Sequence, residues 1–143
     1  MLEVVIFGAV VQRIDKGDFM MSNITWKYVK KLDDPDGIRS FLDKYHVQLP
    51  EKLIKCLYDN NGGRPSEKIF STNRCDGYVC KSLLSFNKND IDSIFKYYPD
   101  LFFGTSLFPF AMDSSGNFIC YDTKMKRYVL WKHETDSIES IKL

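Results

Sequence analysis

The residues best suited to chemistry lie near the end of the chain, where Cys120, Asp122, His133 and Glu134 follow one another closely. On a strand, Cys120 and Asp122 would share one face, whereas the adjacent His133 and Glu134 would point to opposite sides. A cysteine nucleophile needs a base to activate it, and no spacing places a histidine beside Cys120. The chain also has no glycine-rich phosphate loop, HExxH motif or GxSxG motif. We therefore expect a protein that is not an enzyme.

The chain has four cysteines and two histidines, none of them with the spacing of a metal site: Cys56, Cys75, Cys80, Cys120, His46 and His133. The simplest interpretation is four reduced thiols, some of them buried as small apolar side chains. A zinc site assembled by the tertiary structure is the alternative. We expect no cofactor and no metal.

Four helices are predicted from the spacing of apolar residues and from capping signals. A short one is expected over 24–32, and Asp36 is the expected N-cap of the next. The third should start at Leu49 and Pro50, with the proline in its first turn, and end at 60–63, where Gly62 and Gly63 can cap it. The fourth should be capped by 87–90 and stopped by Pro99. The expected buried faces of the last three helices are Ile38, Phe41, Leu42 and Tyr45; Leu53, Ile54, Leu57 and Tyr58; and Ile91, Ile94, Phe95 and Tyr98.

The second half of the chain has the short apolar runs and turn residues of strands. The expected strands are 69–72, 78–86, 107–112, 117–122 and 128–133, and 138–143 is either a last strand or a short helical turn. Helices first, then mostly adjacent strands with one inserted helix, predict an α+β fold. Its centre should be a mainly antiparallel sheet with helices packed on one face.

Residues 113–117 (DSSGN) should form a hairpin turn between two of these strands. Gly116 and Asn117 both tolerate a positive φ, and Asp113 can accept hydrogen bonds from the turn backbone. With Gly62 and Gly63, they are the turn residues that should define the fold. The motif is either turn chemistry alone or, through Asp113 and Ser114, part of a surface that binds a partner.

The net charge of +1, from twenty basic and nineteen acidic residues, argues against a nucleic-acid binder, which needs a basic excess. Charged contacts with a partner must therefore come from local clusters. One candidate cluster is acidic, Asp33, Asp34 and Asp36, and the other is basic, Lys124 and Lys126 beside Arg127. Each could equally be a solvated turn.

The first residues are expected to stand apart from a single domain over 21–143. Residues 2–11 are apolar but too short for a membrane span, and they lack the features of a signal peptide. The codons for 16–18 can spell a ribosome-binding site, so residues 1–20 could be an extension that arises from an upstream start, with the natural protein beginning at Met20 or Met21. Residues 3–7 (EVVIF) could instead be a genuine first strand. Mass spectrometry of the native protein distinguishes the two.

Four motifs in order make the chain resemble the SUKH superfamily, which includes yeast cell-wall-assembly (glucan-synthesis) regulators and many bacterial immunity proteins. They are 47–50 (VQLP), 57–63 (LYDNNGG), 83–87 (LLSFN) and 109–122 (PFAMDSSGNFICYD), the last followed by 128–134 (YVLWKHE). The resemblance covers about 24–134. Members of the superfamily usually continue into a final helix, whereas only nine residues follow Glu134 here.

The resemblance implies an α+β fold around a central sheet and a function in binding proteins. Its leading implication is a cytoplasmic immunity protein (antitoxin) that binds and neutralises a cognate toxin domain by steric occlusion. Its alternative is a regulatory scaffold of the cell-wall-assembly type. In either case the partner is a protein, not nucleic acid or a membrane.

Overall fold

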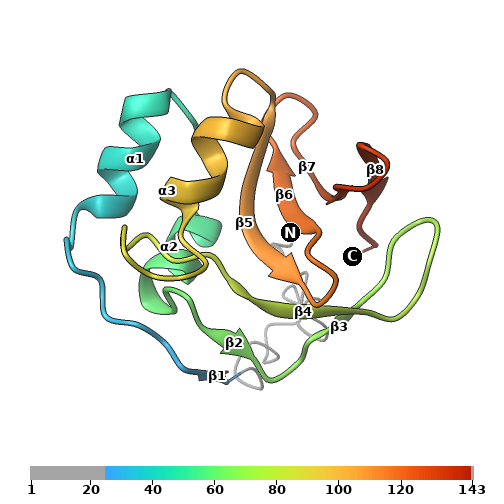
Figure 1. Cartoon of the computed structure of the whole chain (residues 1–143), viewed down its shortest axis with the longest axis horizontal. Coiled ribbons are helices and arrows are strands. Elements are labelled where there is room, and N and C mark those ends of the chain that lie inside the picture. Colours follow the sequence, from blue (N-terminus) through green and yellow to red (C-terminus); the bar gives the residue numbers. More distant parts are fainter. Residues whose placement is uncertain (1–24, 143) are drawn as a thin grey trace.

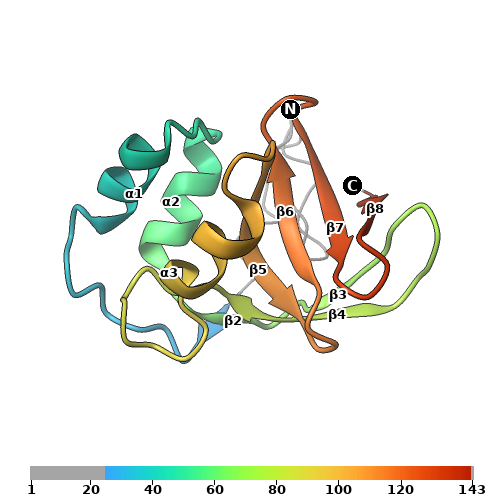
Figure 2. The same cartoon turned by 45° about the horizontal axis from the view of Figure 1, so that its top comes forward.

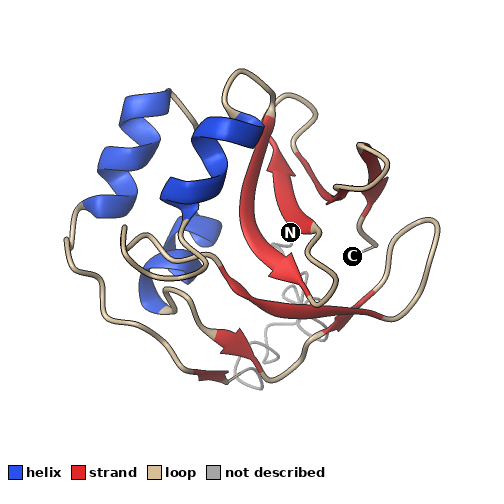
Figure 3. Ribbon diagram, viewed as in Figure 1, coloured by secondary structure: helices blue, strands red, loops and turns tan. Residues whose placement is uncertain are grey.

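The computed structural model describes residues 25–142, and in it helices and strands form separate layers (Figures 1 and 3). The predicted extension, its alternative first strand and both proposed start residues lie outside this range. The elements follow in the order β1 (Trp26–Lys27), α1 (Gly37–Tyr45), α2 (Glu51–Asp59), β2 (Arg64–Pro65), β3 (Ile69–Phe70), β4 (Tyr78–Leu83), α3 (Ile94–Tyr97), η4 (Tyr98–Phe102), β5 (Leu107–Asp113), β6 (Phe118–Asp122), β7 (Arg127–Lys132) and β8 (Ser137–Ser140).

The main sheet has six strands in the order β3-β4-β5-β6-β7-β8, and every neighbouring pair is antiparallel. The helices lie on one side of it (Figure 1). The predicted α+β fold with a central antiparallel sheet is therefore confirmed. The C-terminal segment forms the strand β8, the first of the two alternatives.

The sheet curls until its two edges meet, as the turned view in Figure 2 helps to show. Thr72, after β3, pairs with Ile141, after β8. The Lys142 N–H donates to the Ser71 carbonyl at 2.9 Å, and the Asn73 N–H donates to the Ser140 carbonyl at 2.9 Å. These bonds use backbone groups that an open edge would expose to another chain. Curling also explains why all five residues of β6 are buried.

The core between helices and sheet is built around Phe41 of α1. Its ring lies 4.9–6.1 Å, between centroids, from five other aromatic rings: Tyr45, Phe86, Phe95, Tyr98 and Phe108. Four of these contacts are edge-on, the geometry that the ring quadrupole favours. Removing a buried phenyl ring of this kind costs about 3–5 kcal/mol.

The predicted helix over 24–32 is wrong within the described residues. Trp26 and Lys27 instead form β1, which pairs with β2. The segment lies against Gly63, where a Cβ atom would be 3.1 Å from Val29 and 3.3 Å from the Trp26 ring. Asp36 does precede α1, but its side chain makes no capping bond; its own N–H donates to Asp34 Oδ1 at 2.9 Å.

The fourth predicted helix forms, but its cap, end and buried face differ from expectation. Ser93, rather than 87–90, caps α3 by accepting a hydrogen bond from the Phe95 N–H. Pro99 does not stop the helix, because the chain widens into the π-helical turn η4, closed by the Phe103 N–H on the Tyr98 carbonyl at 3.0 Å. Pro99 lies in the first turn of η4, where a missing N–H leaves no bond of that turn unmade.

Two side chains that were expected in the core are exposed: Tyr58 of α2 and Ile91, before α3.

Candidate functional site

The 113–117 turn is held together by a buried carboxylate. Asp113 Oδ1 accepts from the N–H groups of Ser115 and Asn117, and Oδ2 accepts from the Asn117 side-chain amide at 3.0 Å. Gly116 has φ 87°, whereas Asn117 does not take the positive φ that it could tolerate. Asp113 is only 2% exposed, so its carboxylate defines the turn and is out of a partner's reach. Ser114 is exposed, and its hydroxyl donates to the Val79 carbonyl.

The glycines after α2, Gly62 and Gly63, allow the turn at 60–63 to pack closely against the segment that contains Lys30. Gly62 has φ 69°, and the Lys30 side chain lies where a Cβ on Gly62 would project. A Cβ on Gly63 would lie 2.9 Å from the Asn60 carbonyl oxygen, which real structures do not allow. Asn61, 1% exposed, binds the backbone at Lys30. This turn therefore fixes the segment that leads from β1 to α1.

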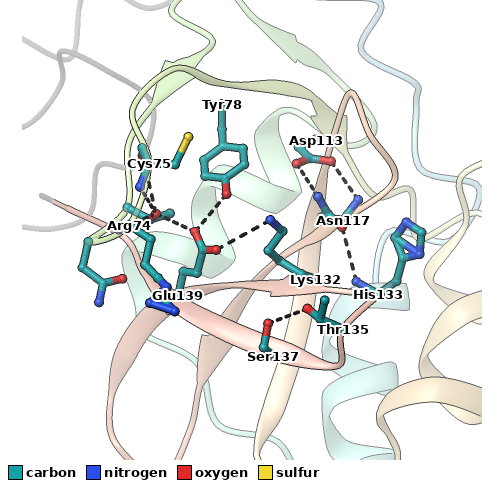
Figure 4. A network of polar contacts seen from close by, with 12 residues as sticks. Arg74, Cys75, Tyr78, Asp113, Asn117, Lys132, His133, Thr135, Ser137 and Glu139 are labelled. Carbon is teal, nitrogen blue, oxygen red and sulfur yellow. Dashed lines mark hydrogen bonds and ion pairs between the residues drawn. The ribbon is translucent and has the colours of Figure 1, made fainter.

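A second buried carboxylate, Glu139 of β8, ties the last strand to β4 (Figure 4). Glu139 Oε1 accepts from the hydroxyls of Thr72 (2.7 Å) and Tyr78 (2.9 Å), and Oε2 lies 3.7 Å from Lys132 Nζ. Burial alone would raise the pKa of Glu139, but these hydrogen bonds and the charges of Lys132 and Arg74 lower it below the usual value. The network closes the sheet, and every polar atom of the carboxylate is used within it.

The chemistry considered for Cys120 has no support in the geometry. Its side chain is fully buried, and burial raises the pKa of its thiol well above the usual value. Burial also raises the pKa of Cys80, and raises that of Cys56 to about 11. His133 stands on the exposed turn after β7, where its N–H donates to Asn117 Oδ1. Among residues 25–142, no three His, Cys, Asp or Glu side chains gather as a metal site would require.

Asp122 also has a structural role. Burial alone would raise its pKa, but hydrogen bonds from Met125, Ser106 and Lys124, with the charge of Arg127, lower it. Its Oδ1 accepts from the N–H groups of Lys124 and Met125 and thereby shapes the turn after β6. That turn presents Lys124 and Lys126 to solvent.

The two charged clusters lie near opposite ends of α1. Asp33, Asp34 and Asp36 are exposed on the loop that enters it. Lys126 lines a hollow with His46, which follows its last residue. A helix of nine residues is about 13 Å long, so the structure does not bring the clusters together.

Two adjoining hollows form one groove at the end of α1, which we call the α1-end groove. The first, about 640 Å³, lies between 46–50 and the turn after β6, and the second, about 290 Å³, continues to 103–108. His46, Val47 and Thr123 line both. His46 and Lys126 have positive φ (57° and 55°), a backbone state that non-glycine residues seldom adopt and that gathers at functional sites.

Apolar side chains stand exposed around this groove. Phe103 is 64% exposed, with its ring 5.6 Å from that of Tyr45, and Met125 on the adjacent turn is 61% exposed. The aromatic pair at 102–103 signals that one ring can stay outside, but the sequence does not bring the α1–α2 loop beside the β6–β7 turn. That proximity depends on how the helix layer packs against the sheet, which local sequence patterns do not report, so sequence reasoning missed the groove.

Comparison with known families decides the classification. The model of the family described as SMI1-KNR4 cell-wall, within SUKH, matches residues 36–142. The chain belongs to the SUKH superfamily. No curated protein and no solved structure matches it significantly. SUKH proteins are generally non-catalytic and act through protein–protein contacts. Within residues 25–142, no helix of this SUKH chain has both the length and the apolar character to span a membrane.

Proposed function

We propose that this SUKH protein is a cytoplasmic immunity protein that binds and neutralises a cognate toxin domain. The α1-end groove is the observation that carries the proposal. Its lining combines an exposed aromatic ring, Phe103, with the cation of Lys126, and the exposed Met125 immediately precedes Lys126 on the same turn. Binding energy in protein interfaces concentrates in such apolar anchors beside a pocket, surrounded by polar groups.

Neutralisation would work by occlusion, without chemistry on the toxin. The groove lies between the α1–α2 loop and the β6–β7 turn, and the Asp122 carboxylate fixes the second of these. The side chains considered for catalysis have structural roles instead: Cys120 is fully buried, and Asp113 and Asp122 hold turns. A rigid frame loses little conformational entropy on binding, which favours a tight complex.

The residues predicted to bind a partner divide into three groups. Lys124 and Lys126 stand beside the groove and belong to the proposed surface. Asp33, Asp34 and Asp36 form a separate exposed edge that a large toxin domain could also reach. The proposed surface leaves out Asp113, whose side chain is buried, and Ser114, which is exposed but does not line the groove. The domain limits, 21–143, stay a prediction.

A regulatory scaffold is the second candidate, because the matching family is described by its cell-wall members. A scaffold would use the same groove for a regulatory partner. Its gene need not lie beside a toxin gene, whereas an immunity gene should.

Co-expression tests the proposal directly. The protein is expressed in cells together with the toxin encoded beside its gene, and growth is followed against cells with the toxin alone. Rescue of growth together with a co-purified complex is the expected result. A toxin that kills equally well in both strains, with no complex formed, would refute the immunity function.

A further inference from the structure

A third hollow, which we call the Arg64 pocket, lies on another part of the surface, next to β1 and β2. It has a volume of about 470 Å³. The side chains that carry the argument come from separate elements: Tyr28 after β1, Lys30, Arg64 of β2, Lys81 of β4, and Asp90 with Asp92. None of the residues that line it also lines the α1-end groove.

Two cations of the Arg64 pocket have no acidic partner within the part of the chain that the structure describes. Among residues 25–142, neither Lys30 nor Arg64 forms an ion pair. Lys30 is nonetheless well placed, because Asn61 binds its backbone N–H and carbonyl and its side chain lies over Gly62. Arg64 is fixed by pairing with Lys27, and its guanidinium lies 5.4 Å from the Tyr28 ring centroid. The positive charge is therefore held in position.

The acids of the pocket are already engaged by protein donors. Asp92 pairs with Lys81 at 3.2 Å. Asp90 accepts from the Ser85 hydroxyl and from the side-chain amide of Asn87. The pocket thus retains two cations for an external carboxylate, while its two aspartates disfavour a polyphosphate or nucleic-acid backbone.

Exposed apolar side chains flank these cations. Tyr28 is 69% exposed, Val29 44% and Ile91 78%. Tyr28 also has φ 60°, an uncommon state for an aromatic residue, and its exposed ring lies beside the Arg64 guanidinium. A small inorganic anion would gain nothing from these groups, whereas a polypeptide with mixed acidic and apolar residues would use both.

We propose that the Arg64 pocket binds an acidic segment of a protein partner, with a carboxylate beside Lys30 and Arg64 and an apolar side chain on Tyr28. This surface is separate from the α1-end groove, so it stands whether or not the proposed toxin binding is correct. It would give a SUKH protein a second contact, either with a second region of one partner or with another protein.

The probe is a fluorescein-labelled peptide of glutamates interspersed with leucines, with anisotropy as the readout. Two matched peptides replace either the glutamates by glutamines or the leucines by glycines. We expect the parent peptide to bind, the glutamine peptide to lose binding at least about fivefold, and about 0.5 M salt to weaken the parent similarly. Equal binding of the parent and glutamine peptides would overturn the proposal.

Variants locate the binding. Arg64→Glu and Lys30→Glu should each weaken the parent peptide at least about fivefold, whereas Lys68→Glu, a matched exposed cation outside the pocket, should not. Tyr28→Ala should weaken the leucine-containing peptide and leave the glycine version unchanged. Circular dichroism checks that each variant is folded. If Arg64→Glu does not fold, Arg64→Gln takes its place. The proposal is refuted if the Arg64 variant binds the peptide as tightly as Lys68→Glu does. It is also refuted if the protein forms a salt-dependent dimer that disappears when Arg64 is replaced.

Discussion

Asn61 and Asn87 bind consecutive carbonyl groups of one loop from two directions. The Asn61 amide donates to the Lys30 carbonyl at 3.2 Å, and the Asn87 amide donates to the Lys31 carbonyl at 2.9 Å. Asn87 Oδ1 also accepts from the Asp33 N–H at 2.8 Å. Two motifs far apart in the sequence therefore have one structural task, which is to hold the segment between β1 and α1. The acidic loop and Lys30 depend on that task for their positions.

Asn61→Ala should destabilise the protein by about 1–3 kcal/mol. The substitution leaves the buried Phe86 N–H, which donates to Asn61 Oδ1 at 2.8 Å, without an acceptor. Urea denaturation measures the change, and Asn89→Ala, at an exposed position nearby, is the control. Equal midpoints for the two variants would show that the Asn61 bonds contribute nothing net.

Gly63→Ala should destabilise more than Gly37→Ala. A Cβ at 63 would lie 2.9 Å from a backbone oxygen, whereas at 37 the nearest atom is 3.6 Å away and φ is not positive. Overpacking against backbone costs about 1–3 kcal/mol, while alanine in place of a helix glycine is neutral or stabilising. Thermal unfolding of both variants checks the order, and a Gly63→Ala protein as stable as the parent would contradict the packing described.

Stability should fall as the pH drops below the usual glutamate range, about 4.3. The folded-state pKa values of Glu139 and Asp122 are lowered, so each carboxylate contributes stability that is present above its unfolded pKa and is lost as pH falls through its folded pKa. Chemical denaturation across this range measures the loss. In Glu139→Gln the loss should be shallower, and in the exposed control Glu67→Gln it should be unchanged. Identical pH profiles for all three proteins would show that Glu139 does not contribute to the loss of stability at low pH.

One thiol of the four should react quickly with a thiol reagent in the folded protein. Cys75 is exposed on the loop between β3 and β4, whereas Cys80 and Cys120 are at most 1% exposed. Cys56 is half-buried, and its pKa of about 11 leaves almost no thiolate at neutral pH. Absorbance counts the fast thiols, and Cys75→Ser should abolish the fast phase. A fast phase that survives this change would show that a second cysteine is accessible.

The sequence predicted the periodic parts of this fold well. The spacing of Phe41 and Leu42, or of Leu53 and Ile54, reports burial directly, because a helix against a core must keep one apolar face. The turn at 113–117 was readable for a similar reason, since Asp113 and Gly116 satisfy local geometry. Motif order added the family, which no single local pattern could supply.

What the sequence missed depends on tertiary contacts. Trp26 has no local reason to be extended, and its strand forms by pairing with Pro65 of β2, beside Gly63. Pro99 normally ends a helix, and the π-helical turn that accommodates it leaves Phe103 exposed. The sequence predicted part of the candidate site: Lys124 and Lys126 were recognised as charges, but His46 and Phe103 lie near them only in the folded chain.

The affinity of the purified protein for its toxin domain, with and without the groove's anchors, tests the central claim most directly. The account predicts that Phe103→Ala with Lys126→Glu weakens the complex at least about tenfold, while Ile69→Ala with Lys68→Glu, exposed residues outside the groove, changes it little. Lys126→Glu keeps a side chain at the positive-φ position, so backbone strain is matched between parent and variant. Undiminished affinity in the groove variant, measured by calorimetry on folded protein, would contradict the claim that the α1-end groove binds the toxin.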